Sequence, residues 1–155
     1  MIGDAFLQIH NFQSLMGIVA GLNIAACRRL KTSWSLLPPS VLQTLTKFER
    51  ILSPQNSFKE YRSVMRDCVP PVLPYLGVYL SDLTAIDSGN PDFIRGLVNM
   101  EKHELIFDVI EKIRFYQADR FDFPPEPSLQ HMLAELCPLP EADLYCLSLF
   151  REPRK

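Results

Sequence analysis

The sequence lacks an excess of charge of either sign. Its 155 residues carry 16 Lys and Arg against 18 Asp and Glu, which gives a formal net charge of -2 at pH 7. A chain with so little net charge has no general field that attracts a polyanion. We therefore expect nucleic acid not to be a ligand, and we expect any partner to be recognised through local contacts.

The sequence also lacks a membrane-spanning run and a secretory signal. Its longest apolar stretch, Leu15 to Cys27, contains an asparagine and two glycines. That stretch is shorter than the roughly 20 residues that a transmembrane helix needs. No Lys or Arg precedes the first apolar residues, as it would in a signal peptide. We expect a cytoplasmic protein that does not insert directly into a membrane.

Paired cysteines and convergent metal ligands are missing as well. The four cysteines are widely spaced with apolar neighbours, which is typical of small buried side chains in a reducing compartment. His131 and Cys137 are the closest pair of possible metal ligands, whereas a zinc site needs three or four. We expect no metal site. The cysteines are Cys27, Cys68, Cys137 and Cys146.

The motifs of common enzymes are absent too. The sequence has no Gly-rich phosphate loop, no HExxH and no GxSxG. Glu135, Glu141 and Asp143 lie close together in sequence, but no His or apolar pocket residue accompanies them as an acid–base pair would require. We therefore expect neither bond-making catalysis nor a bound cofactor.

Apolar residues at helical spacing are what the sequence has in abundance. No run of four or more alternates as in a half-buried strand. We predict an all-α fold, an irregular multi-helix bundle around one core, for which the chain is long enough. The expected helices cover 12–22, 39–53, 57–68, 75–87, 100–118, 128–136 and 141–149.

Local signals mark several of these helix ends. Asn11 and Asn99 are expected N-caps, and Ser57 with Glu60 has the spacing of a capping box. Pro74 is suited to the first position of a helix. Two long helices joined by a short loop follow it, so we predict a protruding helical hairpin over about residues 74–118.

Six short stretches combine aromatic, small and polar residues in a distinctive order. They are HNFQSLMGIVAGLN (10–23), RRLKTSW (28–34), NSFKEYR (56–62), VLPYLGVYLSDLTAIDSGNPDF (72–93), GLVNMEKH (96–103) and LYCLSLFREPR (144–154). In order and type they resemble the catalytic domain of exchange factors for Ras-type small GTPases. The block P-Y-L-G-x-Y-L-S-D-L-T is the most specific, because it combines unusual Pro and Gly positions with a fixed order of side chains.

The resemblance implies a fold and a mechanism. It covers nearly the whole chain and corresponds to the C-terminal part of the family's domain, so residues 1–155 are expected to be a partial Ras-GEF domain that lacks the first helices. Such proteins bind a GTPase of Ras, Rap or Ral type without covalent chemistry. They promote GDP release by inserting a helical hairpin near the Mg²⁺ and phosphate sites.

Three catalytic positions follow from this resemblance. Thr84 falls on the position whose bulk occupies the neighbourhood of the Mg²⁺ ion. Ser88 falls on a position that is often Glu and engages the P-loop, so the preceding Asp87 would have to supply the charge. The alternative for Thr84 and Ser88 is an ordinary solvent-exposed role.

Five positions correspond to residues that contact the GTPase. Asn23 matches an Asn that contacts switch II, but it could instead be a left-handed helix C-cap. Tyr75 falls on an aromatic anchor at the hairpin base and Phe58 on an aromatic that faces the GTPase, although both could be core aromatics. Ser81 falls on a Ser or Thr that faces the GTPase, and Arg28 lies where some members have Tyr.

Two functions stay open at this level. The first is nucleotide exchange; the second is an exchange-inactive scaffold that binds the GTPase. Helices missing from the domain would leave apolar core exposed and the hairpin loosely held, which favours the second. A further polypeptide could complete the core, and the GTPase would recruit the chain to membranes. An exchanger should carry Thr84, Asp87 and Ser88 on an outer face near the hairpin tip, with Asn23 and Phe58 on a concave surface.

Overall fold

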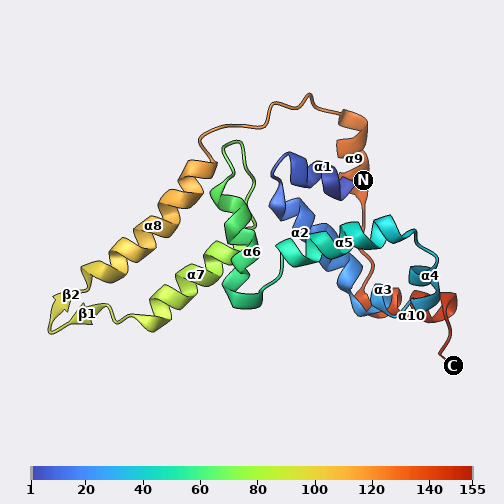
Figure 1. Cartoon of the computed structure of the whole chain (residues 1–155), viewed down its shortest axis with the longest axis horizontal. Coiled ribbons are helices and arrows are strands. Elements are labelled where there is room, and N and C mark those ends of the chain that lie inside the picture. Colours follow the sequence, from blue (N-terminus) through green and yellow to red (C-terminus); the bar gives the residue numbers. More distant parts are fainter. Residues whose placement is uncertain (1, 155) are drawn as a thin grey trace.

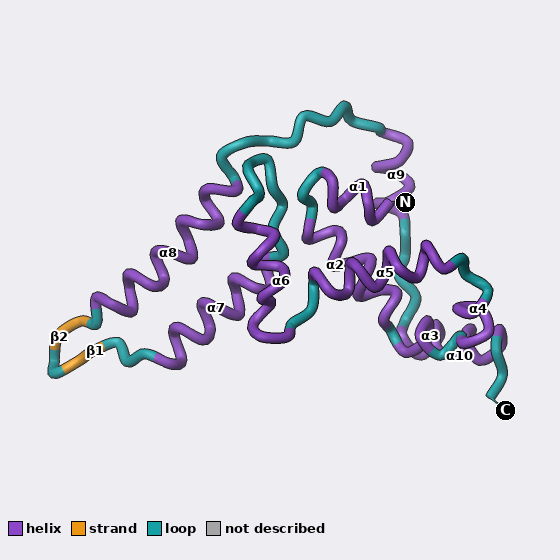
Figure 2. The backbone as a smooth tube through the Cα atoms, viewed as in Figure 1, coloured by secondary structure: helices purple, strands orange, loops and turns teal. Residues whose placement is uncertain are grey.

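The computed structural model describes residues 2–154, and helices dominate this part of the chain. It contains helices α1 to α10 and two short strands (Figures 1 and 2). The all-α prediction is confirmed. The predicted range 1–155 also includes Met1 and Lys155, which lie outside the described residues.

The body of the molecule is built from the N-terminal helices. Helix α1 (Ile2–Gln8) packs on α2 (Phe12–Asn23), α2 packs on α5 (Pro39–Ile51), and α5 packs on α6 (Gln55–Arg66). Phe12, Leu15, Tyr61 and Val78 are the largest fully buried side chains. The ring of Phe12 meets that of Tyr61 edge-on, with centroids 5.4 Å apart. This cluster joins α2 and α6 to the first turn of the next helix.

Two single-turn helices, α3 (Ala25–Arg28) and α4 (Lys31–Ser35), link α2 to α5 where the sequence predicted only a turn. Residues of this link bind Glu152, which follows the last helix. Arg29 donates a 2.6 Å hydrogen bond to the Glu152 carbonyl, and the Glu152 carboxylate accepts bonds from the backbone N–H groups of Thr32 and Ser33. The last helix, α10 (Glu141–Arg151), therefore packs against α3.

Helices α7 (Leu76–Gly89) and α8 (Met100–Tyr116) form a hairpin that projects from the body (Figure 1). Its tip is a two-stranded antiparallel ribbon, β1 (Phe93–Ile94) and β2 (Leu97–Val98). The ribbon turns at Gly96, whose φ of 80° lies in the region that glycine adopts freely. The hairpin lies within the predicted range 74–118.

Two of the predicted caps form and one does not. The Asn11 carboxamide accepts from the N–H of Ser14, and that of Asn99 accepts from the N–H of Lys102. The predicted capping box at Ser57 is wrong, because Asn56, Ser57 and Phe58 form a left-handed turn with φ between 50° and 60°. An N-cap residue needs a negative, β-region φ to present its oxygen to the helix.

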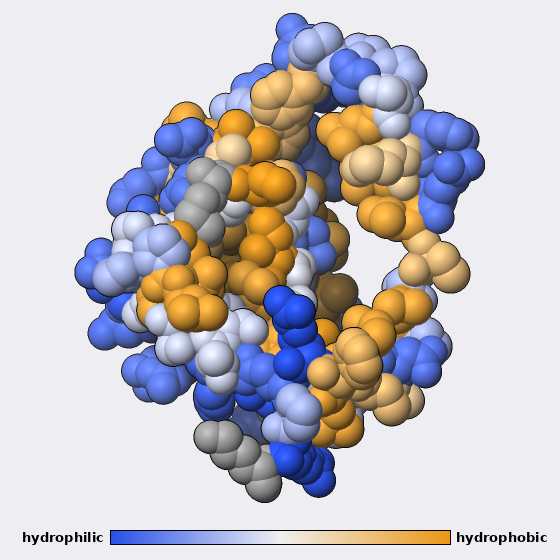
Figure 3. All heavy atoms as spheres, turned by 90° about the vertical axis from the view of Figure 1, so that its right-hand side faces the viewer, coloured by the Kyte–Doolittle hydropathy of each residue, from blue (hydrophilic) through white to orange (hydrophobic). Residues whose placement is uncertain are grey.

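Several side chains expected in the core are exposed. On α9 (Pro127–Glu135) the predicted apolar stripe faces solvent, with Leu129, Met132 and Leu133 each about half exposed. Figure 3 shows apolar side chains spread over the molecular face on this side. Cys137 and Cys146 are also exposed, so only Cys68 among the cysteines is buried as predicted. An amphipathic pattern indicates a helix and its apolar face, but not what covers that face.

None of the helices described between residues 2 and 154 is long and apolar enough to cross a membrane.

Candidate functional site

The tip of the hairpin is held by one buried lysine. The Nζ atom of Lys102 lies 2.7 Å from a carboxylate oxygen of Asp87 and 2.6 Å from one of Asp92, and it also donates to the Asp87 carbonyl. The Lys102 side chain is 5% exposed. Asn99 adds two bonds, from its N–H to the Asp92 carbonyl and from its side chain to the Pro91 carbonyl. The end of α7, the loop and the start of α8 therefore form one hydrogen-bonded unit.

These contacts shift the pKa values of the charged groups at the tip. Hydrogen bonding to Asp87 and then to Asp92 raises the pKa of Lys102 above its ordinary value. The hydrogen bond from Lys102 lowers the pKa of the Asp92 carboxyl. Each shift favours the charged form of its own group, so both Lys102 and Asp92 are ionised at neutral pH.

The outward face of α7 carries three of the predicted residues. Ser81, Thr84 and Ser88 are exposed and follow one another at helical spacing of three and four. The hydroxyls of Thr84 and Ser88 donate to the carbonyls of Leu80 and Thr84, at 2.9 and 2.8 Å. Their hydroxyl protons are thus used within the helix, and their lone pairs stay open to a partner.

Asp87 is exposed near the tip, as an exchanger requires, but it points elsewhere. Around the axis of α7 its position lies about 100° from Ser88 and about 60° from Thr84, and its carboxylate pairs with Lys102 of α8. The structure thus places Thr84 and Ser88 together on the outer face, while the charge of Asp87 is directed at the partner helix.

Two predicted aromatics meet at the base of the hairpin. The rings of Phe58 and Tyr75 have centroids 6.0 Å apart, and both side chains are half-buried at the edge of the core. The ring of Tyr75 lies over Gly77, where an added Cβ would come within 2.5 Å of it. The N–H of Tyr75 donates to the hydroxyl of Tyr61 at 2.9 Å. Helix α7 is therefore anchored to α6 at its first turn.

Asn23 and Phe58 share a surface hollow of about 380 Å³, which Leu52 and Glu49 also line. Asn23 is the last residue of α2, and the chain leaves it through Ile24 in an extended conformation with φ -59° and ψ 150°. The alternative of a left-handed C-cap is therefore wrong. The two residues form the concave surface that was expected to accompany the hairpin.

Arg28 is already engaged within the chain. Its Nε donates to the side-chain oxygen of Asn23, and its Nη2 pairs with the carboxylate of Glu49. Its guanidinium also lies 5.3 Å from the centre of the Trp34 ring. Arg28 thus fixes the carboxamide of Asn23 and is less available for a partner than the sequence suggested.

Possible metal ligands do not converge within residues 2–154, where no group of three or more His, Cys, Asp or Glu is placed to hold an ion. His131 pairs with Glu135 one turn away on α9, at 3.3 Å, rather than approaching Cys137.

Comparison with known proteins identifies the family. The model of the RasGEF domain matches residues 1–104, which include the body, α7, the tip and the start of α8. The chain belongs to the RasGEF domain family. All eight predicted site residues of this RasGEF chain lie inside the matched range.

Individual relatives of this RasGEF chain are similar to it beyond residue 104, over nearly its whole length. "Ras guanine nucleotide exchange factor R" of Dictyostelium discoideum is 40% identical over 156 residues, 100% of this chain and 9% of that protein. "Ras guanine nucleotide exchange factor J" of the same organism is 39% identical, over 94% of this chain and 18% of that protein. "Ras-specific guanine nucleotide-releasing factor 1" of Mus musculus is 35% identical, over 99% of this chain and 12% of that protein. The chain therefore spans less than a fifth of these relatives' length.

Sequence reasoning missed two residues of the RasGEF hairpin. Leu80 is 62% exposed on α7, next to Ser81 and one turn from Thr84. An apolar residue at an outward helical position could have indicated it. Lys102 gave no such signal, because its partner Asp87 is fifteen residues away and is brought close only by the register of the hairpin.

Proposed function

We propose that this chain is a guanine nucleotide exchange module for a Ras-family GTPase, with α7 as the element that enters the nucleotide site. One observation carries the proposal: a helix that projects from the body of a RasGEF chain presents Leu80, Ser81, Thr84 and Ser88 together to solvent. A projecting face that combines an apolar side chain with small hydroxyls suits insertion between two loops of a partner.

The mechanism is displacement by binding. A nucleotide held at picomolar affinity has about 16 kcal/mol in its complex, so its spontaneous loss is slow. By linkage, a module that weakens nucleotide binding must itself prefer the nucleotide-free GTPase by the same factor. Leu80 and Thr84 would supply bulk where Mg²⁺ bridges the phosphates. The hydroxyl lone pairs of Thr84 and Ser88 would accept from P-loop N–H groups that lose the phosphates.

The base of the hairpin would hold the rest of the GTPase. The hollow lined by Asn23 and Phe58 provides a polar carboxamide beside an aromatic edge. The contact of Phe58 with Tyr75 links this hollow to the first turn of α7. We infer that switch II occupies it, and that Tyr75 fixes the angle at which α7 leaves the body.

Exchange assays on two matched leucine variants test the proposal. Leu80→Asp places a charge in the proposed interface, and Leu105→Asp places one on the other helix of the hairpin, where Leu105 is 40% exposed. Release of a fluorescent GDP analogue from Ras, Rap and Ral proteins is measured with each chain. We expect acceleration by the wild type, its loss in Leu80→Asp, and its retention in Leu105→Asp. Equal loss in both variants would contradict entry through α7.

Binding without exchange is the second candidate function, and the direction of Asp87 favours it. With that carboxylate bound to Lys102, the outward face of α7 carries hydroxyls where many relatives are expected to carry an acid. A scaffold would bind the GDP-loaded and nucleotide-free GTPases with equal affinity, whereas an exchanger must prefer the nucleotide-free form. Titrating both forms with the chain separates the two functions.

The GTPase panel also determines which of the Ras, Rap and Ral types is served. We further propose that the chain works in the cytoplasm and reaches membranes through its GTPase. Vesicles that carry a lipid-anchored GTPase should capture the chain, and vesicles without the GTPase should not.

Completion of the core by a further helical polypeptide is also a proposal. Its support is an apolar hollow of about 230 Å³ between α2, α4 and α5, lined by Leu22, Trp34, Leu37 and Val41 among others. Strong binding of an apolar dye by the purified chain is the expected result, and a monodisperse monomer without dye binding would contradict the proposal.

A further inference from the structure

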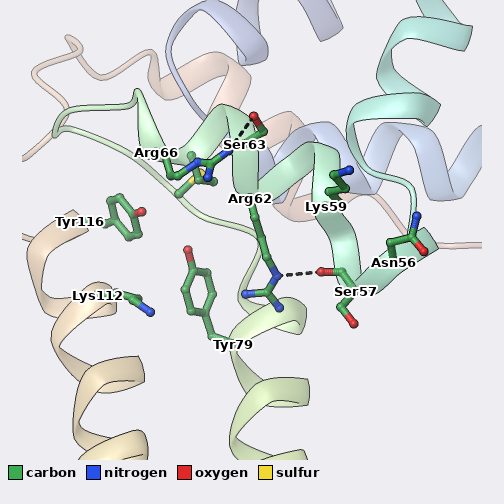
Figure 4. A pocket seen from close by; sticks show the side chains of 10 residues that line it. Asn56, Ser57, Lys59, Arg62, Ser63, Arg66, Tyr79, Lys112 and Tyr116 are labelled. Carbon is green, nitrogen blue, oxygen red and sulfur yellow. Dashed lines mark hydrogen bonds between the residues drawn. The ribbon is translucent and has the colours of Figure 1, made fainter.

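A hollow of about 480 Å³, lined mainly by residues with polar or charged groups, lies at the root of the hairpin, where α6, α7 and α8 meet (Figure 4). Four of the residues that line it are basic and none is acidic. This sign is unexpected in a chain that has more Asp and Glu than Lys and Arg. The basic residues are Lys59, Arg62 and Arg66 on α6 and Lys112 on α8.

One of the four cations serves the fold. Arg62 donates two hydrogen bonds to the Asp82 carboxylate, at 2.9 and 2.7 Å, and its Nε donates to the Ser57 carbonyl at 2.7 Å (Figure 4). This fork joins α6 to α7, and Asp82 neutralises its charge. Arg62 therefore shapes the hollow without adding net charge to it.

The other three cations have no carboxylate partner among residues 2–154. Arg66 makes only a 3.2 Å hydrogen bond to the Ser63 hydroxyl, and no ion pair of Lys59 or Lys112 is formed in that range. Three like charges around one hollow repel one another, and the repulsion weakens when an anion enters. The electrostatics of the hollow thus favour an anionic ligand.

The geometry favours phosphate in particular. Arg66 extends from α6 and Lys112 from α8, so a ligand between the helices meets cations from two sides, while Lys59 lies on the other side of α6 (Figure 4). The guanidinium fork suits two phosphate oxygens at once, and an ammonium group suits a third. The hydroxyls of Ser57 and Ser63, and those of Tyr79 and Tyr116, also line the hollow.

We propose that this hollow binds a small ligand that carries two or more phosphate groups. The bound ligand bridges Lys112 of α8 to Arg66 of α6, two helices that are otherwise joined mainly through α7. It therefore stiffens the root of the hairpin. This binding is independent of the proposed exchange activity, because it requires no GTPase.

Calorimetric titration of the whole chain with inositol trisphosphate, without a GTPase, tests the proposal. Removing one charged contact in Arg66→Gln or in Lys112→Gln is expected to weaken binding about tenfold. The matched controls are Lys47→Gln and Arg50→Gln, exposed cations of α5 that line a different hollow. The controls should bind as the wild type does, and saturation should slow amide exchange in α8.

Two further arms separate the sources of the phosphate. Phosphatidylcholine vesicles with and without a phosphoinositide bisphosphate test a lipid headgroup, and pyrophosphate tests a free phosphate compound. Capture by the doped vesicles would support the proposal with a membrane source, and binding of soluble probes alone would support it with a free ligand. No binding of any probe at low salt, or equal weakening in the α5 controls, would overturn it.

Discussion

Lys102 and Tyr61 show how single side chains position the candidate site without facing it. Lys102 collects two carboxylates at the tip of the hairpin, and the Tyr61 hydroxyl accepts the N–H of Tyr75 at its base. Tyr61 is 1% exposed, and burial raises its pKa to about 12. The Lys102 and Tyr61 side chains are themselves buried, although the contacts that they make are only partly buried.

Replacing Lys102 distinguishes a positioning role of Asp87 from a direct one. In Lys102→Met the two carboxylates lose their shared cation, so we expect exchange to fall several-fold and Lys102→Arg to restore part of it. If Asp87 acts only through Lys102, the losses in Lys102→Met and Asp87→Asn will not add in the double variant. Additive losses in GDP release would show that Asp87 contacts the GTPase itself.

Removing the Tyr61 hydroxyl should destabilise the fold. Tyr61→Phe leaves the N–H of Tyr75 without its partner, which costs about 1 to 2 kcal/mol in the free energy of unfolding. Tyr145→Phe is the control, because the Tyr145 hydroxyl accepts its hydrogen bond from Arg154 at the surface, where water can replace it, and its removal should have a smaller effect. Denaturant unfolding of both variants checks this, and equal effects would contradict it.

At the scale of elements, the hairpin and the start of α6 show what sequence can predict. Helices α2, α7 and α8 were predicted nearly to their ends, because apolar spacing, Pro74 and two Asn caps mark them. The left-handed turn at the start of α6 was missed, because the spacing of Ser57 and Glu60 is that of a capping box whether or not the cap forms. Helices α3 and α4 were missed because one turn shows no periodicity. The direction of Asp87 depends on hairpin register, which no local pattern contains.

The hairpin tip should stay intact across neutral pH and loosen only in strong acid or strong alkali. Because the pKa of Asp92 is lowered, its ion pair stabilises the tip above the ordinary Asp pKa of about 3.9 and is lost as pH falls through the lowered value. The raised pKa of Lys102 places its own loss above about pH 10.4. The NMR signal of the Asn99 amide, bonded to the Asp92 carbonyl, should follow the acid transition. In Asp92→Asn this transition should disappear.

Over the whole molecule, stability is concentrated in the body. The core joins α2, α5, α6 and the start of α7 and includes Val109 of α8, while α9 contributes no buried residue. The C-terminal helix is held instead by polar contacts of Arg29 and Glu152. The sequence indicated apolar faces on most of these helices, α9 included, and only the fold separates the apolar faces that are covered from those that are not.

Matched leucine substitutions should reveal this division. Leu15→Ala empties a fully buried position and is expected to cost about 3 to 4 kcal/mol. Leu133→Ala removes the same atoms from a side chain that is 55% exposed, and should cost less than about 1 kcal/mol. Thermal or denaturant unfolding measures both. Comparable losses would show that α9 is covered in solution.

The hairpin is long, and only a few contacts near its root fix its direction. Helix α8 has 17 residues, so at 1.5 Å per residue it is about 25 Å long. A rotation of about 10° at its root would move the tip by roughly 4 Å, more than the length of a hydrogen bond. Contacts at the root, such as Tyr75 over Gly77 and Arg62 with Asp82, therefore determine where the side chains near the tip are placed.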